Sequence, residues 1–247
     1  MKNLLHAKST IVTGGASGIG AKIVEKFAEE GAALIAIVDV NEAAAKKYAD
    51  EISEKYHCRC IAIRASVDKE DDVKACFSKF MEYTDRLDVL VNCAGVGGIM
   101  PMDDITNERW ERTFNINVKG TFFLSREALH IMKPQKYGRI INFSSQAGRQ
   151  GGLVIGMDYS SSKGALLTLT KSLAKEAAPY SITVNCVVPG LIATDMTKDF
   201  GYDPTTVPLG RVGTPEEVAD VVVFAASDMS RYMTGASLDV NGGICMY

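Results

Sequence analysis

Short apolar runs rich in β-branched residues alternate with longer segments of helical periodicity along nearly the whole chain. Parallel strands need connections of helix length, and a parallel sheet is covered by helices on both faces. This alternation therefore predicts an α/β fold with a doubly wound parallel sheet of about seven strands. The predicted strands are 10–12, 34–38, 60–63, 89–91, 140–143, 182–188 and 237–240, and the predicted helices are 19–30, 42–55, 71–83, 108–132, 159–177 and 215–226.

The length of 247 residues fits one domain, 1–247, and the 47% hydrophobic content is that of a globular protein. A net charge of −3 argues against a nucleic-acid partner. No secretory signal is evident, and the longest apolar runs, such as 32–38, are too short to cross a bilayer. Six scattered cysteines and three isolated histidines match no metal spacing. We expect a reduced, cytoplasmic protein with no metal and no membrane partner.

Three glycines, Gly14, Gly18 and Gly20, lie between the first predicted strand and the first predicted helix. Glycine there lets the chain turn tightly and lets backbone N–H groups approach a pyrophosphate at the helix N-terminus. An ordinary glycine-rich turn is the alternative. Because a predicted strand precedes these glycines and a predicted helix follows them, a dinucleotide site is favoured over an ordinary turn. Its expected residues are Gly14, Ser17, Gly18, Ile19 and Gly20.

Asp39 ends the second predicted strand, 19 residues after Gly20, close to the spacing of an acid that binds the adenosine ribose. A carboxylate there repels a 2′-phosphate, and neither Ser17 nor Val40 supplies a cation. The sequence therefore favours NAD(H) over NADP(H). The alternative is that Asp39 only caps the following helix.

Tyr159 and Lys163 are four residues apart at the start of a predicted helix, so they share one face. A phenol must titrate about three units below its ordinary pKa of about 10 to act as acid and base near neutrality, and a nearby ammonium can supply the roughly 4 kcal/mol that this shift needs. The alternative is an aromatic ring packed on the sheet beside a solvated lysine.

The order of these motifs resembles the short-chain dehydrogenase/reductases of the Tyr-x-x-x-Lys type, a family with a Rossmann-like fold. Between the glycine segment and Tyr159 come 92–95, Asn117 and the pair Ser144 and Ser145; Pro189 and Gly190 follow. The resemblance runs from about residue 8 to residue 243. It implies an NAD-dependent enzyme that interconverts a secondary alcohol and a ketone by hydride transfer.

The resemblance also assigns roles. Tyr159 exchanges the proton, Lys163 modulates its pKa and binds the ribose, and Ser145 holds the substrate oxygen, with Ser144 as the less favoured choice. Asn117 bends a helix and anchors a proton-relaying water, unless it only satisfies its own helix. The further cofactor contacts that it implies are Val67, Asn92, Gly95, Pro189, Gly190, Ile192 and Thr194. Ser66 stands where many members carry Asp, and Asp68 is the candidate to compensate.

The substrate is expected to be a small-molecule alcohol or ketone, selected by residues 146–158 and 191–212 of the two polar stretches 146–158 and 191–214; steroids, sugars, polyols, diols and acyl thioesters all fit this chemistry. A 3-oxoacyl-carrier-protein reductase is the main alternative, because 207–211 and 241–243 resemble that subgroup. Asp39 opposes it, since those reductases usually take NADPH, and 197–207 looks shorter than their substrate loop. A non-catalytic NAD-binding scaffold or sensor is a remote alternative.

The family resemblance predicts a homo-oligomer, most often a tetramer. The long predicted helices 108–132 and 159–177 would bury their outer faces between subunits. Their candidate contacts are Trp110, Leu166, Leu167, Leu169 and Leu173, with packing in the subunit's own core as the alternative.

Overall fold

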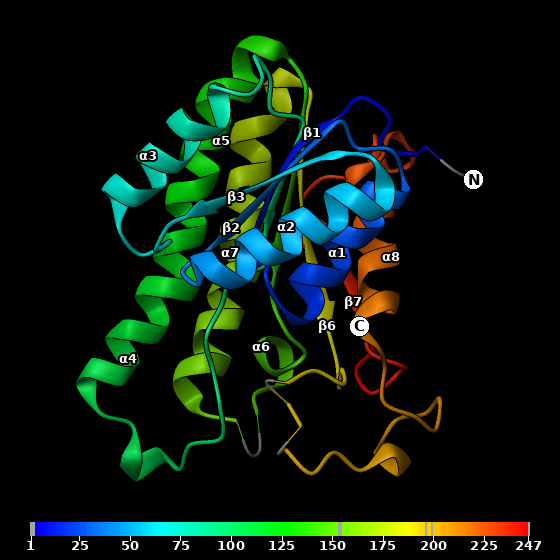
Figure 1. Ribbon diagram of the computed structural model, residues 1–247. Coiled ribbons are helices and arrows are strands. Elements are labelled where there is room, and N and C mark those ends of the chain that lie inside the picture. The colour runs from blue at the N-terminus through cyan, green and yellow to red at the C-terminus, as the bar shows by residue number, and fades with distance from the viewer. Residues whose placement is uncertain (1–2, 153–154, 196, 199, 247) are drawn as a thin grey trace.

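The computed structural model describes residues 3–152, 155–195, 197–198 and 200–246 (Figure 1). In these ranges seven parallel strands form one sheet in the order β3-β2-β1-β4-β5-β6-β7. The doubly wound parallel sheet predicted from the alternating pattern is confirmed. The strands are β1 (Ser9–Thr13), β2 (Leu34–Asp39), β3 (Arg59–Arg64), β4 (Val89–Asn92), β5 (Gly138–Phe143), β6 (Ile182–Pro189) and β7 (Ser237–Val240).

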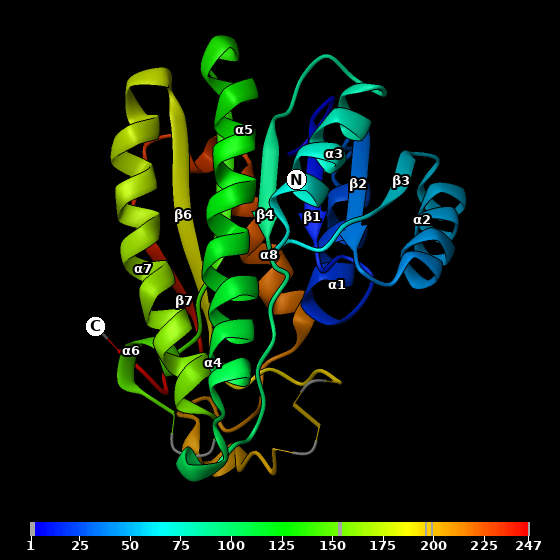
Figure 2. The same ribbon diagram turned by 90° about the vertical axis from the view of Figure 1, so that its left-hand side faces the viewer.

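Helices cover both faces of this sheet. Figure 2 shows α3, α5 and α7 side by side on one face, while α1 and α8 lie on the other, with α2 beside the β3 edge (Figures 1 and 2). The helices are α1 (Gly18–Glu29), α2 (Glu42–Tyr56), α3 (Glu70–Met81), α4 (Asn107–Phe114), α5 (Thr121–Gln135), α6 (Ala147–Gln150), α7 (Met157–Ala177) and α8 (Pro215–Ala226).

The core is divided in two by the sheet, because successive side chains of a strand point to opposite faces. In β1, Val12 joins an apolar cluster formed with α1, α2 and α8, whereas Ile11 joins a second cluster formed with α3, α5 and α7. Continuous burial on both faces explains why the central strands are uninterrupted apolar runs.

The predicted helix 108–132 is interrupted in the structure. A stretch of π-helix, Asn115–Gly120, separates α4 from α5. Such wide turns occur mostly at functional sites, where they redirect a side chain. The interruption places Asn117 in the interior and leaves α4 free to run toward the start of α7 (Figure 2).

The two stretches expected as loops contain some regular structure. α6 lies within 146–158, and a 3-10 turn, Pro204–Thr206, lies within 191–214. Ile192 also forms a parallel bridge with Gly213, which ties the base of the second stretch together. Residues 153, 154, 196 and 199 of these stretches fall outside the described residues.

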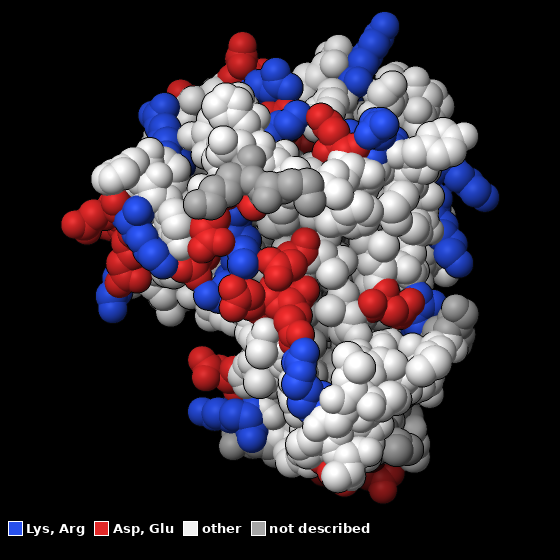
Figure 3. Space-filling view, turned by 90° about the vertical axis from the view of Figure 1, so that its right-hand side faces the viewer, with Lys and Arg blue, Asp and Glu red and all other residues white. Residues whose placement is uncertain are grey.

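Charged side chains of both signs intermingle on the face that carries α1 and α8 (Figure 3). Lys26 of α1 reaches Glu216 and Asp220 of α8, each at 3.1 Å, and so links the two helices at the surface. Over the residues that the structure describes, no helix has the length and apolar character that a membrane span requires.

Candidate active site

A cavity of about 970 Å³ opens at the carboxyl ends of the strands, where ligands bind in open α/β sheets. Its size lies at the upper end of the range for ligand pockets. It spans the point between β1 and β4 at which the strand order reverses. The predicted site residues in its lining are Gly14, Ser17, Gly18, Ile19, Gly20, Asp39, Val67, Gly95, Ser145, Tyr159, Lys163, Pro189, Gly190, Ile192 and Thr194.

The glycine segment forms one wall of this cavity. Gly14 has a φ of 64°, and a side chain there would approach the Ala94 backbone at 2.9 Å; a side chain on Gly20 would collide with the Gly14 carbonyl. Helix α1 begins at Gly18, and the Ser17 side chain makes no capping bond to it. First-turn N–H groups lack partners within the helix, so this wall fits a pyrophosphate.

Asp39 lies between the glycine segment and the start of α2. Its carboxylate accepts hydrogen bonds from the backbone N–H of Ala16 at 3.3 Å and of Asn41 at 3.0 Å. The alternative that Asp39 caps α2 is wrong, because the cap is Asn41, whose side chain accepts from the Ala44 N–H. The carboxylate is thus held beside the cavity at the end of β2.

Next along the strand order, Ser66 and Asp68 line the same end of the cavity as Asp39. The Ser66 hydroxyl donates to an Asp68 carboxylate oxygen at 2.5 Å. The chain therefore does carry a carboxylate close to the position where Ser66 replaces the usual acid.

Tyr159 and Lys163 come from the first turns of α7. Lys163 is only 5% exposed, and its Nζ donates to the Phe143 carbonyl at 2.8 Å and lies 5.6 Å from the centre of the Tyr159 ring. The alternative of a solvated lysine is therefore wrong. Ser144 is buried and its hydroxyl donates to the Lys163 carbonyl at 2.7 Å, whereas Ser145 faces the cavity.

Two pKa shifts distinguish these groups. The pKa of the Tyr159 phenol is raised above its ordinary value, because the effect of burial outweighs a hydrogen bond with Ser145 that lowers the pKa. Burial also lowers the pKa of Lys163. The sequence interpretation expects the ammonium to make the phenol more acidic, but in this geometry the Lys163 amine is directed to the Phe143 carbonyl instead.

Asn117 joins three segments beneath the cavity. Its side chain donates to the Val96 carbonyl at 2.9 Å and to the Ser162 hydroxyl at 3.0 Å, and accepts from the Val96 N–H at 2.8 Å. These partners lie outside its own helix, so the alternative that it satisfies its own helix is wrong. Asn117 fixes the irregular segment that follows β4 against α7.

Known proteins resemble this chain over its whole length. Residues 14–245 match a family model described as enoyl-(acyl carrier protein) reductase. The chain is 38% identical over 249 residues to the 3-oxoacyl-[acyl-carrier-protein] reductase FabG of Aquifex aeolicus, covering 99% of this chain and 100% of that relative. A FabG from Staphylococcus aureus is 37% identical over 247 residues, covering 97% and 98%. The chain belongs to the short-chain dehydrogenase/reductase family.

The solved structures agree. A short-chain type dehydrogenase/reductase from Mycobacterium marinum superposes with a TM-score of 0.93 at 32% identity, covering 98% of this chain and 97% of that one. The protein is therefore an oxidoreductase of this family, whose members bind a nicotinamide cofactor. The cavity at the reversal of strand order is the place where this fold holds a dinucleotide.

Asn92 differs from the adenosine contact expected of it. It lies below the cavity, buried, and its side-chain amide donates to Asn142 at 2.8 Å and to Ser125 at 3.1 Å. These two hydrogen bonds hold the Asn92 amide against β5 and α5, away from the cavity. It links β4 to β5 and α5.

Several lining residues escaped the sequence analysis. Arg112 and Ile116, four residues apart, both reach the cavity from the region of α4. Gly97 lies so close to Tyr159 that any side chain there would collide with its ring. Gln146 also lines the cavity, and its Oε1 is buried with no partner among the described residues. Helical spacing could have grouped Arg112 with Ile116, but only the packing of α4 in the folded chain brings both to the cavity that Tyr159 lines.

Proposed function

We propose that the protein is an NAD(H)-dependent oxidoreductase that interconverts a secondary alcohol and a ketone. The observation that carries this proposal is that Tyr159, Lys163 and Ser145 share one cavity with the glycine segment and Asp39. An acid/base group and a dinucleotide cradle in one enclosed space are what hydride transfer requires.

In the proposed mechanism a bound nicotinamide supplies the hydride chemistry, and this chain orients the substrate and moves the proton. Tyr159 gives a proton to the carbonyl oxygen in reduction, and burial keeps the phenol protonated for that step because it raises the phenol pKa. Ser145, hydrogen-bonded to the phenol, holds the same substrate oxygen. Lys163, whose pKa burial lowers, is the group that returns a proton to Tyr159.

The choice of NAD(H) rests on charge at the end of β2. Of the described lining residues, the only cations are Arg112 and Lys163, and neither belongs to the segments around Asp39. Arg64, the register partner of Asp39 on β3, is exposed and is absent from the described lining. A 2′-phosphate beside Asp39 would cost on the order of 4 kcal/mol per pair of like charges before relaxation. We expect a preference for NAD(H) of about two decades in kcat/KM.

The cofactor experiment compares kcat/KM for NAD(H) and NADP(H) in the wild type and in a double variant, Asp39→Ala with Val40→Arg. The double variant should shift toward NADP(H), because it removes the repulsion and adds a phosphate partner. Single Val40→Arg is the matched control, since it adds the cation but keeps the carboxylate. A wild type that uses NADPH as well as NADH would show that Asp39 does not select the cofactor.

A second candidate function is 3-oxoacyl-carrier-protein reduction, favoured by 38% identity to a relative of that name. The two candidates differ in substrate and cofactor. Turnover of a 3-oxoacyl thioester on carrier protein far above that of simple ketones, with NADPH preferred, would establish the second candidate and exclude the first.

We further propose that the protein is a single cytoplasmic domain that assembles as a homotetramer. Leu166 and Leu173 do not support this assembly, since both are buried in the subunit core. Trp110 and Phe122, which are 40% and 41% exposed on α4 and α5, offer apolar surface instead. All six cysteines are free, which suits a reducing compartment. Sedimentation as a single species near 26.6 kDa would contradict the tetramer.

A further inference from the structure

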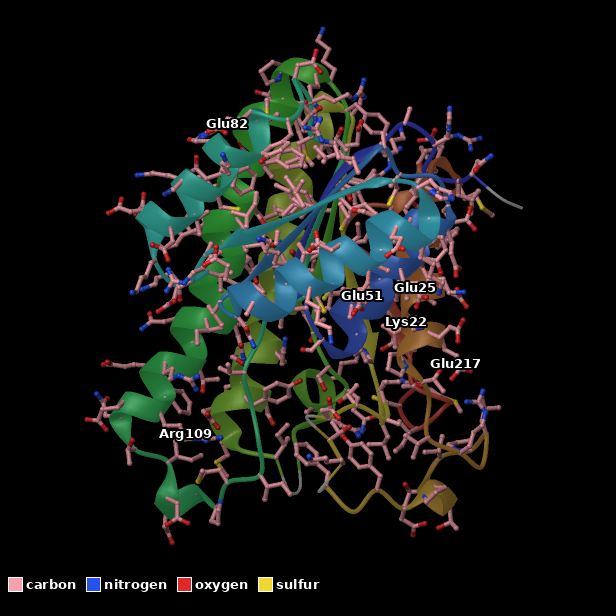
Figure 4. All side chains as sticks on the ribbon, viewed as in Figure 1. Lys22, Glu25, Glu51, Glu82, Arg109 and Glu217 are labelled. Atoms are coloured by element: carbon pink, nitrogen blue, oxygen red, sulfur yellow. The ribbon has the colours of Figure 1, made fainter. Side chains whose placement is uncertain are left out.

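Helix α4 carries two arginines, Arg109 and Arg112, whose surroundings differ sharply. Arg109 reaches from α4 toward the first turns of α7 (Figure 4), where its Nε lies 3.1 Å from a carboxylate oxygen of buried Asp158. The same oxygen accepts the Thr113 hydroxyl at 2.7 Å. Arg112, by contrast, is exposed and forms no ion pair with any residue that the structure describes. The charge of Arg109 is thus paired with a carboxylate within the fold, whereas the charge of Arg112 has no carboxylate partner among the described residues.

Arg112 lies at the Tyr159 end of the main cavity. It lines that cavity and also a side pocket of about 270 Å³, which it shares with Gly95, Gly97 and Arg109. Gly97 packs on the Tyr159 ring, and Gly95 lies against Asn117 and Lys163. Arg112 therefore shares the main cavity with Tyr159 and shares the side pocket with the glycines that pack against the Tyr159 ring and Lys163.

Acidic and basic side chains line different segments of the cavity wall. Asp39 and Asp68 lie at the ends of β2 and β3, and Asp195 and Asp203 lie on the stretch after β6. Lys163 is buried and bound to the Phe143 carbonyl, so its charge is not presented to a second ligand group. Arg112 is thus the one exposed cation among the described lining residues. A guanidinium in that setting pairs well with a planar anion, through two parallel hydrogen bonds.

We propose that the substrate carries an anionic group, a carboxylate or a phosphate, which Arg112 binds while the carbonyl lies at Tyr159. This inference rests on the proposed function and narrows its substrate to anionic ketones and hydroxy compounds. Arg109 supports the site because its carboxylate partner keeps it in place beside the side pocket, and Arg112 supplies the binding charge.

The test compares matched ketones of one carbon skeleton: a keto acid, its methyl ester and the corresponding keto phosphate. Each is assayed with the wild type, Arg112→Met, Arg112→Lys and the control Arg231→Met. Arg231 is an exposed arginine that is absent from the described lining of the cavity. Its replacement by methionine removes the same unit of positive charge as Arg112→Met. Methionine and arginine have similar helix propensities, so α4 should persist.

The wild type should favour at least one anionic ketone over the ester by about tenfold or more in kcat/KM, and Arg112→Met should lose about 10- to 100-fold on that ketone. The ester should change by less than about threefold. Arg112→Lys should recover part of the loss, and Arg231→Met should match the wild type. The preferred anion, carboxylate or phosphate, identifies the substrate group.

Two results would overturn the inference. Equal turnover of ester and anions by the wild type would leave the proposed function standing but remove the anion subsite. A loss in Arg112→Met that is the same for ester and anions would assign Arg112 to structure rather than to recognition. Absence of turnover for every ketone with either nicotinamide cofactor would overturn the proposed function itself, and this inference with it.

Discussion

Asp88 and Asp158 are both fully buried and both pair with an arginine, but they lie at opposite ends of the sheet. At the amino end, the Asp88 carboxylate accepts from Arg86 Nε at 3.0 and 3.1 Å and from the Ser9 N–H at 2.8 Å. At the carboxyl end, one Asp158 oxygen has no hydrogen-bond partner among the described residues.

Beyond these pairs, buried polar groups that lack partners among the described residues occur at both ends, because Arg139 Nε and Thr183 Oγ1 lie near the starts of β5 and β6. At the carboxyl end, Gln146 Oε1 and the Arg109 Nε and Nη2 groups are buried without hydrogen bonds among the residues described, and Lys163 is buried without a carboxylate. Burying polar groups in this way costs stability. The contrast that holds is between the two aspartates: both Asp88 oxygens are bonded within the fold, whereas one oxygen of Asp158, the neighbour of Tyr159, keeps bonding capacity.

Tyr159→Phe tests the functional end and should have the largest effect. It deletes the exchangeable proton and keeps the ring, so kcat should fall by two to four decades. NADH binding and the melting temperature should stay close to wild type. Steady-state kinetics with a calorimetric titration would measure both, and activity within about threefold of wild type would remove Tyr159 from its assigned role.

Asp88→Asn tests the structural end. The amide presents a donor to Arg86 and to the Ser9 N–H, so the free energy of unfolding should drop by about 2–3 kcal/mol. The values of kcat and KM well below the melting temperature should not change, because the cavity lies at the other end of the sheet. Chemical denaturation paired with kinetics would show whether stability alone responds; a large loss of kcat would break the comparison.

Asp158→Asn should destabilise less than Asp88→Asn, by about 1–2 kcal/mol, because the wild-type carboxylate is already incompletely bonded. It should also lower kcat by about tenfold, since Asp158 fixes the turn of α7 that carries Tyr159. Asp88→Asn is its matched control for loss of a buried charge. Equal effects of the two variants on kcat would show that both act through stability.

Glu25→Gln tests the surface network of α1 (Figure 4) and should have the smallest effect. Hydrogen bonds from Lys22 and Lys55 lower the pKa of Glu25 from 4.5 to about 2. Because the folded pKa is the lower one, this stabilisation is complete above the unfolded pKa and is lost as pH falls from about 4.5 to about 2.

At neutral pH the Glu25→Gln variant should lose about 1 kcal/mol, since partly exposed pairs are screened. Denaturation curves of variant and wild type should converge as the pH approaches 2. A difference that persists at that pH would mean that packing of the side chain, rather than its charge, stabilises the helix.

Local rules predicted much of this molecule. The order of strands and helices follows from continuous apolar runs and from the 3.6-residue period, and the glycine segment follows from the backbone freedom that a close turn needs. Asp39 could be singled out because it ends the second strand, 19 residues after Gly20. The preference for Ser145 over Ser144 rested on the family's usual separation from Tyr159; in the structure both serines line the cavity, and the Ser144 hydroxyl donates to the Lys163 carbonyl.

The sequence by itself determined the α/β order of strands and helices, because that order depends on patterns among near neighbours in the chain. The family resemblance supplied most of the residues expected at the carboxyl edge, of which the structure brings Tyr159, Lys163 and Ser145 to one cavity. Only the tertiary structure decided that Asn92 turns into the sheet, that Lys163 binds a backbone carbonyl, and that Arg109 is neutralised while Arg112 is open. Each depends on how helices and strands distant in sequence pack. The direction and partners of a side chain are therefore fixed only when those elements come together.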